Sequence, residues 1–70
     1  MMKYEVTSKD NFKKSVFYFE DEALAFAEHL VENSSHKFPA AFIRTEKDGE
    51  PVGPIHIVRP KLKLVPKARQ

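Results

Sequence analysis

The stretch Val16-Phe17-Tyr18-Phe19-Glu20-Asp21-Glu22-Ala23-Leu24-Ala25-Phe26-Ala27-Glu28-His29-Leu30-Val31 decides the fold of this chain. It opens with apolar residues, which predict the end of a β-strand over residues 12–19. Asp21 is the expected N-cap of a helix, since the flanking acids Glu20 and Glu22 would lie near the positive end of its dipole. The apolar positions that follow recur at helical spacing and predict one buried face, made of Ala23, Leu24, Phe26, Ala27, Leu30 and Val31.

An alternating pattern precedes this stretch. Residues 2–7 alternate between apolar and polar side chains, which is typical of a half-buried strand. Residues 8–11, Ser-Lys-Asp-Asn, favour a turn, because Asp and Asn side chains bond their own backbone. The strand over residues 12–19 is therefore expected to run antiparallel to the first. Its end is apolar on both faces, and only one of these can meet the helix.

Two more strands are predicted after the helix, which we expect to end at residues 33–35. One strand covers residues 40–45, and Asp48-Gly49 is a strong hairpin signal because both residues accept positive φ. The last strand covers residues 55–58 and is placed at a sheet edge, since prolines and a glycine precede it. The sequence thus predicts an α+β fold with the order β-β-α-β-β. Its antiparallel sheet has three to four strands, with one helix packed on one face.

Charge is distributed unevenly along the 70 residues, although the net charge is only +2. Residues 1–35 hold four lysines and seven acids, whereas residues 36–70 hold eight bases and three acids. We interpret residues 1–58 as one small domain and residues 59–70 as a basic tail without acids, whose bases are Arg59, Lys61, Lys63, Lys67 and Arg69. Such asymmetry favours an electrostatic partner, while a merely solvated tail explains it equally well.

The sequence predicts a cytoplasmic location. Its longest apolar runs, such as residues 16–19, are much shorter than the roughly 20 residues of a membrane span. The N-terminal residues lack the apolar core of a secretory signal, and the chain has no cysteine for disulfides. We therefore expect no contact with a membrane.

Catalytic and metal-binding patterns are not found in the sequence. His29, His36 and His56 lack the short spacing of metal-ligand motifs, and no serine lies in a glycine elbow. The carboxylates at residues 20–22 are explained by the start of a helix. We therefore expect no catalytic residues, no metal, no cofactor and no enzymatic activity.

One family resemblance spans most of the chain. The aromatic strand is followed by Asp21-Glu22-Ala23-Leu24 and Ala27-Glu28, and Val58-Arg59-Pro60 precedes Pro66-Lys67 near the end. This order resembles the small early protein that some short-tailed phages use to inhibit the host bacterial RNA polymerase. The resemblance implies a sheet with one helix that binds the polymerase jaw through arginines near the last strand. Arg59 matches one such arginine, but Ile57 stands where a second is expected, so a main contact of the family would be missing.

Two functional hypotheses follow. The first is a phage or mobile-element inhibitor, monomeric or a small homo-oligomer, that docks on a host protein such as RNA polymerase through its last strand and basic tail. The second is a nucleic-acid-binding module that uses the same basic residues, with aromatic side chains stacked on bases. A structural subunit of a larger assembly is a third possibility. The expected partner-binding residues are Tyr18, Phe42, Arg44, Arg59, Lys61 and Lys63.

Overall fold

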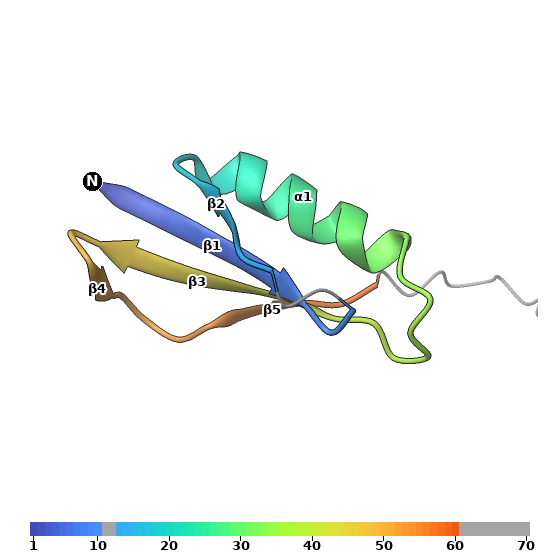
Figure 1. The fold of residues 1–70 in the computed structure, drawn as a ribbon. Helices are drawn as coiled ribbons and strands as arrows, with labels where there is room; N and C mark the ends of the chain where they lie inside the picture. The colour runs from blue at the N-terminus through green and yellow to red at the C-terminus, as the bar shows by residue number, and fades with distance from the viewer. Residues whose placement is uncertain (11–12, 61–70) are drawn as a thin grey trace, which may run out of the picture.

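The computed structural model describes residues 1–10 and 13–60. Figure 1 shows a two-layer α+β arrangement in which one helix lies over one face of an antiparallel sheet. The elements in chain order are β1 (Met2–Ser8), β2 (Ser15–Phe17), α1 (Glu20–Glu32), β3 (Ala41–Lys47), β4 (Glu50–Pro51) and β5 (His56–Val58). This confirms the predicted fold class and the order of its main elements.

β1 and β3 form the centre of the sheet. They pair along their whole length, from Met2 opposite Lys47 to Ser8 opposite Ala41. β2 pairs with the other edge of β1, while β4 and β5 both pair with β3, so the order is β2-β1-β3 followed by two short segments. Because strand side chains alternate, Val6 and Ile43 face α1 and their neighbours Glu5 and Arg44 face the opposite side. We call that second side the outer face.

The Asp48-Gly49 turn confirms the predicted hairpin. Asp48 has φ 53° and Gly49 has φ 87°, and the pair joins Lys47 to its partner Glu50. Positive φ at both central residues gives the turn whose twist matches that of the strands. Beyond β4, the segment of residues 53–55, which contains Pro54, interrupts pairing to β3, and β5 resumes it. Proline explains the interruption because it lacks an N–H to donate.

Two predicted boundaries are wrong around the start of the helix. β2 covers Ser15–Phe17 and not residues 12–19, of which residue 12 lies outside the described part. Phe19, not Asp21, occupies the N-cap position and has extended backbone angles. The carbonyl of Phe19 accepts a hydrogen bond from the N–H of Ala23 at 3.1 Å, which starts the helix earlier. The chain must therefore leave the sheet after Phe17.

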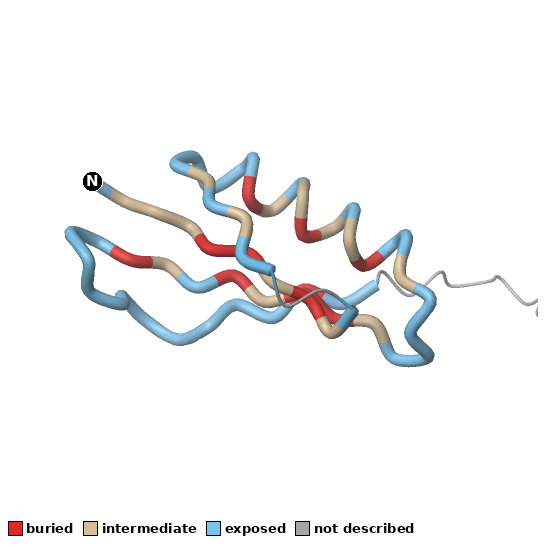
Figure 2. Tube along the Cα trace, in the orientation of Figure 1, coloured by how far each residue is buried: buried red, intermediate tan, exposed pale blue. Residues whose placement is uncertain are grey.

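The core between α1 and the sheet is built from small side chains. Ala23, Ala27 and Val31 of the helix are buried, as predicted, whereas Leu24, Phe26 and Leu30 pack only partly against them. Val6 is the largest fully buried side chain in the described residues. Figure 2 shows the buried positions facing each other across the two layers. The sheet contributes the remaining members of this cluster, Val6, Ala41, Ile43 and Val58.

The end of α1 is closed by a side chain. The helix ends at Glu32, and Asn33 Nδ2 donates to the carbonyl of His29 at 2.9 Å. Asn33 has φ −101°, so it does not take the left-handed conformation that asparagine would permit there. α1 has 13 residues, and the described part of the chain contains no helix that is long and apolar enough to cross a membrane. Of the predicted basic tail, only Arg59 and Pro60 belong to the described residues.

Candidate protein-binding surface

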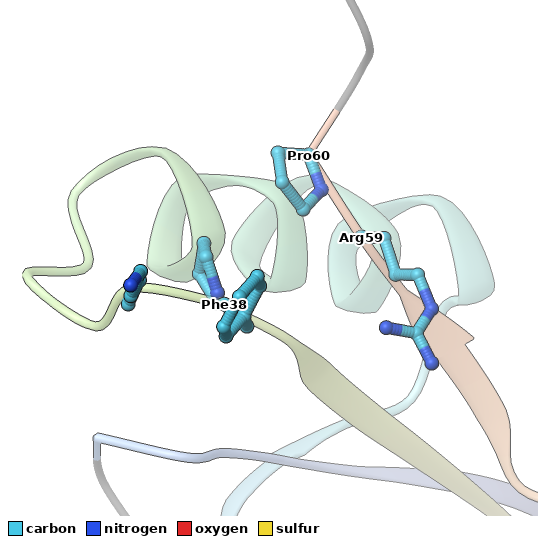
Figure 3. Close-up of a pocket in the computed structure, with 5 residues that line it drawn as sticks. Phe38, Arg59 and Pro60 are labelled. Atoms are coloured by element: carbon cyan, nitrogen blue, oxygen red, sulfur yellow. The ribbon is translucent and has the colours of Figure 1, made fainter.

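A groove lies at the end of the molecule where β5 stops and the loop from α1 enters β3. Its volume is about 470 Å³, and its lining residues are Lys37, Phe38, Pro39, Arg59 and Pro60. We call this the Phe38 groove. Val58 pairs with Ala41, so the residues just after β5 lie opposite the residues just before β3. Figure 3 shows Phe38 and Pro60 on the two sides of the groove, with Arg59 extending from the end of β5 beside them.

Hydrogen bonds hold the loop that carries Phe38. Lys9 donates from Nζ to the carbonyl of Phe38 at 2.9 Å, and its N–H donates to the carbonyl of Ala40 at 3.1 Å. The N–H of Phe38 donates to His36 Nδ1 at 3.3 Å. Ser34 anchors the start of the loop through its hydroxyl, which donates to an Asp10 carboxylate oxygen. The apolar ring of Phe38 is nevertheless 65% exposed.

The groove presents positive charge beside this ring. Lys37 Nζ lies 5.8 Å from the centroid of the Phe38 ring, and Arg59 lines the same groove. Among residues 1–10 and 13–60, neither Lys37 nor Arg59 forms an ion pair. Their charges are therefore available to a ligand.

The cations of the outer face are arranged differently. Lys3 lies 3.4 Å from Glu46 and 3.6 Å from Glu5, and the side chains of both glutamates are only 11% exposed. Lys14 reaches Glu5 at 3.7 Å, and Arg44 reaches Glu46 at 3.4 Å. Three cations thus surround two carboxylates across β1 and β3, which leaves little net charge on this face. We call these five residues the charge ladder.

The charge ladder gives a testable pKa for Lys3. A hydrogen bond to Glu46 and its negative charge raise the pKa of Lys3 above the ordinary 10.5, and the charge of Glu5 adds to the shift. Because the pKa is raised on folding, the stabilisation is complete below the unfolded pKa and is lost as pH rises through the folded one. A ¹³C NMR titration of the Lys3 side chain should give a midpoint above 10.5.

The matched control for this titration is Glu46→Gln. It removes one charge and keeps a hydrogen-bond acceptor of similar shape, so the pKa of Lys3 should fall back toward 10.5. A wild-type midpoint at or below 10.5, or a midpoint that Glu46→Gln leaves unchanged, would show that the charge ladder does not form as described.

Apolar side chains lie on the outer face beside the charge ladder. Phe42 is half-buried there, in register between Thr7 of β1 and Ile57 of β5. Ile57 and Val16 are both exposed, and among the described residues no helix or strand lies over this face. Within the described residues, the outer face thus presents exposed apolar side chains around the charge ladder, whose three cations and two carboxylates leave a net charge of +1.

The structure places the expected partner-binding residues in separate regions. Arg59 lines the Phe38 groove, while Phe42 and Arg44 belong to the outer face, where Arg44 is engaged with Glu46. Tyr18 lies in the connection between β2 and α1, at the opposite end of the molecule from the groove (Figure 1). The other two expected residues, Lys61 and Lys63, lie outside the described part of the chain.

A smaller hollow of about 120 Å³ adjoins the groove on the helix side. It shares Arg59 and Pro60 with the groove, and Glu28, Val31 and Glu32 of α1 form its other walls. Arg59 therefore lies between an apolar, basic groove and the acidic side of the helix. At this end of the molecule, basic residues from the second half of the chain therefore lie next to acidic residues of α1.

A search of the described residues finds no group of three His, Asp or Glu side chains that could hold a metal ion. Comparisons of the chain with protein-family models, with curated proteins and with solved structures return no match. Assignment of a function therefore depends on the surface geometry and on the sequence.

The sequence patterns did not identify Phe38 and Pro39 as residues that line the groove. A Phe-Pro pair within a polar loop was a usable signal, because a large apolar side chain there has no strand or helix pattern to bury it. Its proximity to Arg59 depends on the pairing of β3 with β5, which residue patterns alone do not specify.

Proposed function

We propose that this chain is a small binding protein without catalytic activity that docks on another macromolecule, as an inhibitor of a host machine such as bacterial RNA polymerase. One observation carries the proposal: large apolar side chains lie outside the core, while the core itself consists of alanines, valines and the single isoleucine Ile43. Exposed apolar groups that gather on one surface are characteristic of protein interaction sites. The exposed large apolar residues lie in more than one region of the surface and are Met1, Val16, Tyr18, Phe19, Phe38, Val52, Ile55 and Ile57.

The end of β5 is the best supported docking region. Arg59 is exposed, is free of ion pairs within the described residues and lies beside an exposed aromatic ring. Arginine and aromatic residues are the side chains that most often dominate binding energy in protein interfaces. Arg59 also matches one of the arginines that the resemblance to the phage inhibitors of RNA polymerase implies for the contact.

A direct binding measurement tests this proposal. The full chain is immobilised, and purified bacterial RNA polymerase is passed over it. Arg59→Ala should weaken binding by about tenfold or more, since one hot-spot side chain is worth at least about 1.4 kcal/mol. The matched control is Lys47→Ala, which removes an exposed cation at the far end of β3 and should leave the affinity unchanged. Absence of binding, or equal losses in both variants, would contradict the proposal.

Nucleic-acid binding remains the alternative, because residues 59–70 contain five basic residues and no acidic residue. Single-stranded DNA and RNA are titrated against the full chain at two salt concentrations. Affinity that falls steeply with salt would favour this alternative over a protein partner.

A further inference from the structure

The Phe38 groove combines apolar walls with positive charge. Phe38, Pro39 and Pro60 provide the walls, and Lys37 and Arg59 provide the charge. The groove differs from the outer face, where the cations of the charge ladder are engaged with Glu5 and Glu46. A ligand of the groove must therefore match an apolar surface together with two cations that form no ion pair within residues 1–10 and 13–60.

The groove is also held in place before any ligand arrives. Lys9 donates to the carbonyl of Phe38 at 2.9 Å, and Ala41 of β3 pairs with Val58 at the opposite wall. Both walls thus continue from paired strands of the same sheet. Binding to a surface that is already ordered avoids part of the entropic cost of forming an interface.

We propose that the Phe38 groove binds a short acidic segment of a partner protein. The segment places an aromatic or large aliphatic side chain against Phe38 and the prolines, and its carboxylates pair with Lys37 and Arg59. The inference rests on the proposed function and names the chemical class of the partner's contact segment. Charge complementarity carries it, since no carboxylate lines the groove within the described residues.

Two other occupants fit the charges less well. A nucleic acid that left the groove past Arg59 would bring its phosphates to Glu28 and Glu32, which line the adjoining hollow. Residues 61–70 of the chain itself contain bases and no acid, so they would be repelled by Lys37 and Arg59. An acidic protein segment short enough to end within the groove stays clear of Glu28 and Glu32, and its charge is opposite to that of Lys37 and Arg59.

The test is a ¹⁵N NMR titration of the full chain with the end-blocked peptide Glu-Glu-Trp-Glu-Glu. Shifts are expected in the amide signals of Lys37, Phe38 and Arg59, and not in the charge ladder. The peptides Gln-Gln-Trp-Gln-Gln and Lys-Lys-Trp-Lys-Lys separate the apolar contribution from the charge. The acidic peptide should bind best and the basic peptide worst.

Variants locate the binding site. Phe38→Ala and Arg59→Ala should each weaken binding of the acidic peptide by about tenfold, while Lys47→Ala should not change it. All three positions are exposed, so the dispersion of the NMR spectrum is expected to stay native.

Three outcomes would overturn the inference. One is no preference for the acidic peptide. Another is stronger binding of a thymidine oligonucleotide, which would assign the groove to nucleic acid. The third is a concentration-dependent shift of the groove signals without any ligand, which would assign it to a second copy of the chain. The titration contains no RNA polymerase, so its result is independent of the polymerase-binding measurement. The groove can fail to bind the acidic peptide while the chain still docks on polymerase through Arg59. Equally, the peptide can bind the groove while the chain does not bind polymerase.

Discussion

Ala27→Leu is expected to lower the free energy of unfolding by about 2 to 3 kcal/mol, the upper part of the range for overpacked cores. Ala27 is 0% exposed and lies in the middle of the helix face that meets the sheet. Val6 and Ala41 of the sheet belong to the same buried cluster and are also 0% exposed. A leucine there must push the helix away from the sheet or adopt a strained rotamer. Urea denaturation followed by circular dichroism measures the change.

Ala25→Leu is the matched control for this substitution. Ala25 lies in the same helix but is exposed, and leucine has nearly the helix propensity of alanine. The control should change the free energy of unfolding by less than about 0.5 kcal/mol. If Ala27→Leu lowers the free energy of unfolding no more than Ala25→Leu does, the buried alanine does not bring α1 into close contact with the sheet.

Phe17→Ala is expected to cost about 2 kcal/mol, less than truncation of a fully buried phenylalanine because Phe17 is only half-buried. The rings of Phe17 and Phe26 lie 5.3 Å apart and tilted by 45°, and this contact joins β2 to α1. β2 has three residues, so it depends strongly on such contacts. The same urea denaturation, together with amide exchange at Val16 and Phe17, detects the loss.

The control for Phe17→Ala is the neighbouring Phe19→Ala. Phe19 is 64% exposed, and its contribution to the start of the helix is a backbone carbonyl that alanine retains. The change in unfolding free energy should stay below about 0.5 kcal/mol. Equal losses of unfolding free energy at both positions would contradict the structure, in which Phe17 packs against the core and Phe19 is exposed.

The helix face and the hairpin were predictable from the sequence because each rests on a local rule. Ala23, Ala27 and Val31 repeat at helical spacing, and the Asp48-Gly49 pair permits positive φ. The end of the second strand was not predictable in this way. Four apolar residues in a row suit a strand, but the pairing of β2 with β1 ends at Phe17 opposite Tyr4, and Phe19 is already the N-cap of α1.

The candidate site was less accessible to sequence reasoning than the fold. Arg59 was chosen for its charge and for the resemblance, and the structure adds its neighbours Phe38 and Pro60. Arg44 has the same charge but is engaged with Glu46, which lies two residues further along β3 on the same face of the sheet. A charge pattern therefore identifies candidate residues, whereas strand pairing determines which of them are available to a partner.

The small core and the exposed aromatic side chains have the same structural cause. A single helix covers a single face of the sheet, and alanines bring these two layers close together. Larger apolar side chains, such as Phe38 and Ile57, then lie beyond the covered area. This arrangement reduces the apolar surface area that is buried on folding, which lowers the stability of a small domain. It also leaves exposed apolar side chains that a partner can cover.

Hydroxyl-radical footprinting of the free chain, read by mass spectrometry, tests this arrangement most directly. The modification rate of each phenylalanine reports its exposure to solvent. Phe38 and Phe19 should be modified faster than Phe17 and Phe26, whose rings pack against each other beside the core. Phe38 modified as slowly as Phe17 would contradict the account, because it would mean that the groove is already filled and no aromatic surface is left for a partner.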